Sequence, residues 1–113
     1  MTREFILMPE FERQWKNMDL DDDDLSRFEE EILRNPATGS VISGTGGLRK
    51  VRFAYDGKGK SGSVRVLYVD FVVSEQILLI YAYPKNKKAT ITKEERNSFK
   101  KLITTITTER NHI

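Results

Sequence analysis

The sequence predicts an α+β fold, in which helices pack on one face of a small antiparallel sheet. Two patterns support this fold class. Three central segments rich in β-branched and aromatic residues are separated only by short turns, as in a meander of strands. The segments before and after them carry apolar residues at the spacing of amphipathic helices. A length of 113 residues fits one domain with one modest core, and we expect that domain to span 1–113.

The N-terminal part predicts one strand and two helices. Residues 3–8, REFILM, have a strand-like composition and stop at Pro9, a residue well suited to open a helix. Apolar side chains then recur at helical spacing over 11–18. A second helix follows the four aspartates at 21–24, which suit the positive end of a helix dipole. This placement explains the acidic run better than a metal site does, because metal ligands have to converge on one point.

The C-terminal part predicts three strands and one helix. The strands are 48–55, 64–73 and 76–83, and the last is almost continuously apolar, as expected for a central strand. Their short turns make them antiparallel neighbours. Thr92 and Glu95 have the spacing of a capping box, which predicts the start of a final helix. The predicted element order is therefore β-α-α-β-β-β-α.

Charge is segregated along the chain. The segment 19–31 has eight acidic residues and one basic residue, a net charge of −7. The whole chain carries +2, so the remainder carries +9. Segregation of this kind favours a face that binds a polyanion. The alternative is that both segments are ordinary solvated surface.

The segment 49–65 concentrates the positive charge, with one acidic residue and six basic ones: Arg49, Lys50, Arg52, Lys58, Lys60 and Arg65. Side chains alternate along a strand, so Lys50 and Arg52 share a face, and Arg65 on the adjoining strand can converge with them. Cations directly opposite one another destabilise a strand pair. Their convergence therefore predicts a bound anion, either a nucleic acid or another phosphate. Lys85, Lys87 and Lys88 follow the third strand and add to the same charge.

Other chemistries are less well supported. The stretch 54–61, AYDGKGKS, fits a loose phosphate-binding loop, but that loop requires a helix after it and here a strand follows. The chain has no cysteine and one histidine, His112 near its end, so disulfides, thiolate chemistry and a zinc site are not expected. We expect no cofactor. The only apolar run near the start, 5–8, is too short for a signal or a membrane span, so we expect a cytoplasmic protein.

Two stretches carry a resemblance to a known family. Residues 44–68, GTGGLRKVRFAYDGKGKSGSVRVLY, and 78–88, LLIYAYPKNKK, resemble the RelE/HigB-type toxins of bacterial type II toxin–antitoxin modules, the HigB-like members in particular. The shared features are the GTGG-x-RK-x-R strand, the glycine-lysine hairpin, an Arg-x-x-Tyr on the next strand and the YAYPKNKK run. The resemblance covers nearly the whole chain and includes the element order.

The resemblance implies a compact RelE-like fold, similar to that of microbial ribonucleases, and cleavage of messenger RNA in the ribosomal A site. Such cleavage inhibits translation and growth. It also implies a cognate antitoxin, a small helix-turn-helix protein, and contact with operator DNA only through the toxin–antitoxin complex. The alternative is a non-catalytic RNA- or DNA-binding regulator, or an inactive toxin relative, that uses the same basic face.

The resemblance also implies roles for residues. Its catalytic positions match Lys50, Arg52, Arg65 and Lys85, with Lys87 or Lys88 as alternatives to Lys85. The residues expected to bind RNA are Arg49, Lys58, Lys60, Tyr68, Tyr83, Lys87 and Lys88. RNA cleavage by its own 2′-hydroxyl needs no metal. Arg65 suits stabilisation of the phosphorane, Lys50 suits the base and Lys85 the acid. Several relatives have a tyrosine or histidine after the basic run, and this chain has neither. Tyr83, Tyr68 or His112 could substitute, so the general acid stays open.

Overall fold

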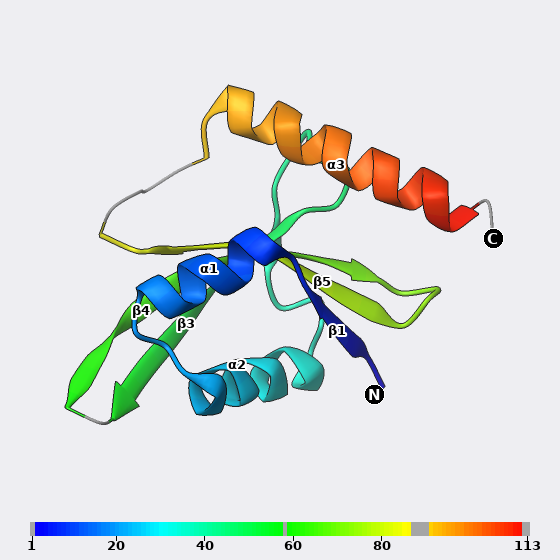
Figure 1. Ribbon diagram of the computed structural model, residues 1–113. Coiled ribbons are helices and arrows are strands. Elements are labelled where there is room, and N and C mark those ends of the chain that lie inside the picture. The colour runs from blue at the N-terminus through cyan, green and yellow to red at the C-terminus, as the bar shows by residue number, and fades with distance from the viewer. Residues whose placement is uncertain (1, 58, 87–90, 112–113) are drawn as a thin grey trace.

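The computed structural model describes residues 2–57, 59–86 and 91–111, without the side chains of Lys60, Arg110 and Asn111. The elements are β1 (Glu4–Leu7), α1 (Pro9–Asn17), α2 (Asp22–Arg34), β2 (Ser40–Val41), β3 (Arg49–Gly57), β4 (Lys60–Phe71), β5 (Gln76–Pro84) and α3 (Lys93–Asn111). The strands form one sheet in the order β1-β5-β4-β3-β2 (Figure 1). The predicted α+β class and the order of the main elements are confirmed.

The three central strands form the predicted antiparallel meander, with β4 between β3 and β5. The two outer strands add features that the sequence did not indicate. β1 lies parallel to β5, and its residues pair in register from Glu4 with Gln76 onward. The two-residue strand β2 pairs antiparallel with the start of β3. It is too short to show an alternating pattern in the sequence.

One face of the sheet is covered by α1 and α2. Phe11 and Trp15 of α1 and Phe28 of α2 are buried against the sheet residues Phe53 and Val66. The rings of Phe11 and Trp15 stack with centroids 5.4 Å apart, and Phe28 meets Phe53 edge-on at 5.5 Å. These aromatic contacts form the larger core.

The other face is covered by α3, which corrects the prediction that all helices pack on one face. Ile103 of α3 is buried together with Leu67, Leu78 and Ile80 of the sheet. The physical reason is visible in β5, where consecutive residues are apolar and point to opposite faces. A strand that is apolar on both sides needs a cover on both sides, and α3 provides the second one (Figure 1).

The helices begin where the sequence predicts. Asp21 caps α2: the Asp24 backbone N–H donates to the Asp21 carboxylate at 2.9 Å, and the Asp21 N–H donates to the Asp24 carboxylate at 3.0 Å. The same reciprocal box joins Thr92 and Glu95 at the start of α3. The aspartate run is therefore explained by the helix start.

A β-bulge in the pairing of β4 with β5 sets which side chains reach the α3 face. Leu67 pairs with Tyr81 and Tyr68 pairs with Leu79, so Ile80 has no opposite residue. Ile80 and Tyr81 are consecutive, yet both pack on the α3 side. After them the side chains alternate between the two faces again, with Ala82 on the α1 side and Tyr83 on the α3 side. An unbroken strand would have turned Tyr83 toward α1, so the bulge redirects it.

Candidate nucleic-acid interface

A row of cations crosses three adjacent strands on the α3 side of the sheet. Arg52 of β3 lies directly opposite Arg65 of β4, and Arg65 lies opposite Tyr83 of β5. Lys50 is two residues before Arg52 and so points to the same face. The predicted convergence of the three cations is therefore confirmed. Arg52 is exposed, whereas Lys50 and Arg65 are half-buried.

This row is electrostatically uncompensated within the part of the chain that the structure describes. The ion pairs there are Arg3 with Asp70, Arg13 with Glu10 and Arg27 with Asp24, and none involves the row. Two guanidinium groups on directly paired residues repel one another. A bound anion would remove that repulsion, and guanidinium groups hold phosphate oxygens with two parallel hydrogen bonds.

Aromatic rings border the row on the side of β5. Tyr83 is 6 % exposed, and its ring centroid lies 6.0 Å from that of Tyr81. The ring of Tyr81 meets Phe99 of α3 edge-on at 5.8 Å. The aromatic contacts therefore connect the basic row to α3. The small exposure of Tyr83 leaves only a minor part of its ring able to contact RNA.

A surface hollow of about 430 Å³ lies at the end of β5. Its lining includes Tyr55, Ser61, Ser63, Lys85 and Asn86. The exposed Lys85 is fixed there through its backbone N–H, which donates to the Ser63 carbonyl at 3.4 Å. An aromatic ring, two hydroxyls and an amide beside a lysine are groups that can hold a nucleobase.

Sequence reasoning did not single out Tyr55. Tyr55 is paired across the hairpin with Gly62, and a Cβ at Gly62 would lie 2.8 Å from the Tyr55 hydroxyl oxygen. The ring therefore packs over the glycine. The tyrosine–glycine match became visible only once the hairpin register was known, because nothing in either strand alone marks it.

Arg49 and Tyr68 lie on the opposite face from the row and pair with one another. The Arg49 guanidinium donates to the carbonyl oxygens of Ala37 at 3.1 Å and Gly39 at 2.6 Å. The Tyr68 hydroxyl donates to the Pro36 carbonyl at 2.8 Å and accepts from the Gly39 N–H at 2.9 Å.

These bonds fasten the segment before β2 to the sheet. Tyr68 is fully buried, and burial raises the pKa of its hydroxyl, which keeps the donated proton in place. Arg49 and Tyr68 thus both bind backbone groups of the chain itself, and the fully buried Tyr68 is not accessible to RNA in this structure. Arg49 is only half-buried, so its expected contact with RNA stays a prediction. Gly39 is required beside Tyr68, since a Cβ at this position would lie 2.8 Å from the Tyr68 hydroxyl oxygen.

Several predicted residues lie outside the described residues: Lys58, Lys87, Lys88 and His112, together with the side chain of Lys60. Their proposed contacts with RNA, and the possible role of His112 as a general acid, stay predictions. The catalytic roles of Lys50, Arg52, Arg65 and Lys85 also stay predictions, although the structure describes where each residue lies.

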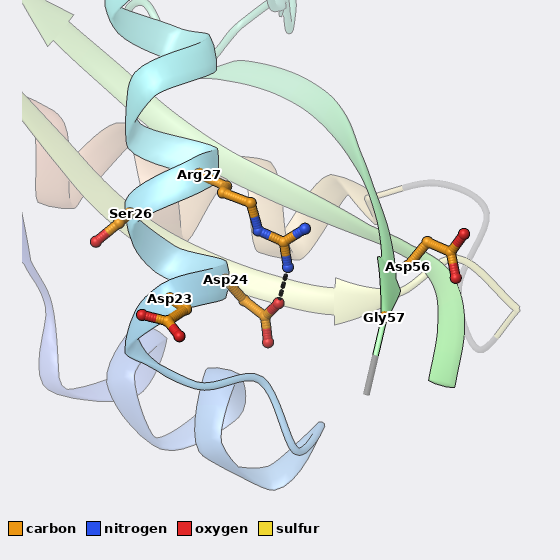
Figure 2. Close-up of a pocket in the computed structure, with 6 residues that line it drawn as sticks. All are labelled: Asp23, Asp24, Ser26, Arg27, Asp56 and Gly57. Carbon is orange, nitrogen blue, oxygen red and sulfur yellow. Dashed lines mark hydrogen bonds and ion pairs between the residues drawn. The ribbon is translucent and has the colours of Figure 1, made fainter. Parts of the chain in front are cut away.

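A second hollow, of about 510 Å³, is acidic (Figure 2). It lies between the start of α2 and the end of β3, and its described lining includes Asp23, Asp24 and Asp56 together with the cation Arg27. The Asp24 carboxylate, which is 2 % exposed, is already engaged by the helix cap and by Arg27. A phosphate would be repelled here. Among the described residues, no group of histidine, cysteine, aspartate and glutamate side chains is arranged to hold a metal ion.

The fold is that of an α+β protein whose sheet carries a row of cations, bordered by aromatic rings, on the face toward α3. The model of a protein family described as "RelE toxin of RelE / RelB toxin-antitoxin system" matches residues 6–112. The chain therefore belongs to the RelE toxin family, and the resemblance seen in the sequence is confirmed at that level.

A solved structure supports the fold. An E. coli toxin RelE, in a double arginine-to-alanine mutant in the free state, matches with a TM-score of 0.52 and 12% identity. The match covers 75% of this chain and 85% of that chain. The two chains thus share the RelE fold. Among the described residues, no helix is both long and apolar enough to cross a membrane.

Proposed function

We propose that this member of the RelE toxin family is an endoribonuclease that cleaves translated messenger RNA in the ribosomal A site. The observation that carries the proposal is the pairing of the exposed Arg52 with the half-buried Arg65 on the α3 face of the sheet, beside Lys50. Membership of the RelE toxin family supports a role as a toxin. The positive face supplies the binding energy for a phosphate backbone.

The proposed reaction uses the RNA itself as the nucleophile. The 2′-hydroxyl loses its proton and attacks the adjacent phosphorus, and the bond to the 5′-oxygen then breaks as that oxygen is protonated. Arg65 and Arg52 stabilise the additional negative charge of the phosphorane. Lys50 lies one strand repeat away on the same face and is the proposed base.

The proposed general acid is Lys85. It follows Tyr83 by two residues, is exposed, and lines the hollow at the end of β5. Tyr83 is nearly enclosed and Tyr68 lies on the other face, so neither is favoured over it. The chemistry requires cations and proton transfer, and the side chains of the face can provide both without a metal ion.

The proposed partners are the ribosome with its messenger RNA and a cognate antitoxin that neutralises the toxin. We expect the protein to act in the cytoplasm, where translation takes place. Operator DNA is expected to be contacted only through the toxin–antitoxin complex.

Induction of the chain in cells without its antitoxin tests the function. The expected result is growth arrest, with new 5′ ends of messages in register with codons. Arg65→Ala should reduce cleavage on programmed ribosomes by about 10²–10³-fold, since it removes one cation from the transition state. The matched control is Arg34→Ala, an exposed arginine in the last turn of α2, which should cleave normally.

Stability is measured on the same variants, because a misfolded Arg65→Ala protein would explain a loss of activity trivially. Normal growth and unchanged message ends on induction would reject the nuclease function. Tight RNA binding without cleavage would favour the alternative, a binding protein that uses the same face.

A further inference from the structure

The orientation of α3 across the sheet is set by two contacts on the same side of the helix, one turn apart. Phe99 meets Tyr81 of β5. Ile103 packs on Leu67, Leu78 and Ile80 of the sheet and also faces the loop before β3, since a Cβ built on Gly46 would lie 3.7 Å from the Ile103 Cγ2 atom. The flank of α3 that carries Ile103 is therefore the flank turned toward the sheet.

Arg96 leaves the helix on this same flank. It precedes Ile103 by seven residues, which is close to two helical turns, and it lies about 10 Å nearer the start of α3. β3 and β5 run in the same direction because each is antiparallel to β4, and α3 runs back along the sheet from the end of β5 (Figure 1).

This geometry brings Arg96 to the basic row. Tyr81, which Phe99 contacts, lies in register with Leu67 and Lys50. Arg96 lies one helical turn nearer the start of α3 than Phe99, and this displacement points to the next strand repeat, where Tyr83, Arg65 and Arg52 are in register. Arg65 lies opposite Arg52 in the same region.

The side chain of Arg96 lacks an acceptor. It is half-buried, and its Nε atom is fully enclosed with no hydrogen-bond partner among the described residues. The ion pairs formed by those residues do not include it either. An enclosed guanidinium N–H without an acceptor is unfavourable, and native structures normally provide a partner or a ligand.

We propose that Arg96 donates to a phosphate oxygen of the RNA held on the basic row, so that α3 forms a second wall of the site. The inference rests on the proposed function, because it takes RNA as the anion. In this arrangement Arg52 and Arg65 contact the phosphate from the sheet, and Arg96 contacts it from α3. Guanidinium groups from two directions can enclose a phosphate more completely than cations on one flat surface.

Binding of an uncleavable RNA tests the proposal separately from catalysis. The probe is a short single-stranded RNA whose 2′-hydroxyls are methylated, so that no attack on phosphorus can occur. Its affinity is measured at two salt concentrations for the wild type, Arg96→Ala and Lys101→Ala. Lys101 is an exposed cation on the same helix, pointing away from the sheet, and its loss changes the net charge equally.

Arg96→Ala should weaken binding about tenfold or more, as expected for the loss of a charge-assisted hydrogen bond. The dependence of log affinity on log salt should become shallower by about 0.7, the value for one phosphate contact on a single strand. Lys101→Ala should change the affinity by less than about twofold. Arg96→Lys keeps the charge, so it should restore the salt dependence and only part of the affinity.

Equal weakening by the Arg96 and Lys101 variants, or an unchanged salt dependence in Arg96→Ala, would overturn the proposal. If the wild type cleaves messages and Arg96→Ala binds normally, the nuclease function stands and this inference fails. If the wild type binds but never cleaves while Arg96→Ala loses affinity, the inference stands and the nuclease function fails. Arg96→Gln, which keeps the side chain as far as Cδ and removes the charge, replaces the alanine variant if the latter does not fold.

Discussion

At the scale of residues, two arginines three positions apart in one strand have different roles. Arg52 points to the α3 face, is exposed and lies opposite another arginine. Arg49 points to the opposite face and donates to two carbonyl groups of the chain. The alternation of side chains along β3 separates them, so the positive charges of this segment lie on two faces of the sheet.

Arg49→Ala is expected to affect stability and to leave RNA binding unchanged. Its two charge-assisted hydrogen bonds are lost, which should lower the free energy of unfolding by about 1–3 kcal/mol. Urea denaturation measures this loss, and RNA affinity is compared for the folded protein. Arg52→Ala is the matched variant and should show the reverse pattern. Weaker RNA binding by the folded Arg49→Ala variant would show instead that Arg49 contributes to RNA binding.

Tyr68→Phe should also destabilise the fold. It leaves the Pro36 carbonyl and the Gly39 N–H without their partner, at a cost of about 1–3 kcal/mol. Burial raises the pKa of Tyr68 in the folded state. The wild type should therefore lose stability as the pH rises through that raised value, and the Phe variant should lack this loss. Denaturation curves at neutral and strongly alkaline pH measure both effects, and identical pH profiles would contradict the assignment.

At the scale of elements, the start of α3 is fixed by a capping box. The Glu95 N–H donates to the Thr92 hydroxyl at 3.1 Å, and the Thr92 N–H donates to the Glu95 carboxylate at 2.9 Å. Phe99 and Ile103 hold the middle of the helix on the sheet. The first turn, which carries Arg96, therefore depends on the cap.

Thr92→Ala should loosen that first turn. Loss of the N-cap costs about 0.5–2 kcal/mol, and hydrogen exchange should become faster at the amides of 95–98 than in the middle of α3. If Arg96 binds RNA, affinity should fall as well, because its helix turn is ordered for a smaller fraction of the time. Thr104→Ala, an exposed change in the helix interior, is the control. Equal exchange rates in the two variants would show that the cap does not hold this turn.

At the scale of the whole molecule, positive and negative charge lie on different parts of the fold. The acidic segment 19–31 lies mainly on α2, which covers the face opposite the basic row. This separation leaves the row free of neutralising side chains among the described residues. It also makes the electrostatic potential asymmetric, so that a polyanion is attracted to the face with the basic row and repelled by α2.

Glu30→Gln together with Glu31→Gln should strengthen RNA binding at low salt. Both glutamates are exposed on α2 and lie far from its N-terminal cap, so the fold should not suffer. The gain should disappear near 1 M salt, where charges more than about 3 Å apart are screened. Affinity at several salt concentrations measures the effect. A gain that persists at high salt would mean that the two residues contact RNA or alter its site directly.

Local patterns in the sequence were sufficient for much of the fold. The alternation along β3 placed Lys50 and Arg52 on one face, and a short hairpin turn placed Arg65 beside them. The capping residues Asp21 and Thr92 marked two helix starts. These features depend on neighbours within a few residues, where the periods of strands and helices and the chemistry of caps act directly.

The sequence by itself thus determined the strand meander, the helix starts, the segregation of charge and the convergence of three cations. Only the tertiary structure decided that α3 covers the second face, that a bulge at Ile80 turns Tyr83 onto it, and that Arg49 and Tyr68 serve the fold. These outcomes depend on pairings between segments far apart in the chain, and the free energy that selects them comes from the packing of the whole core rather than from any local period.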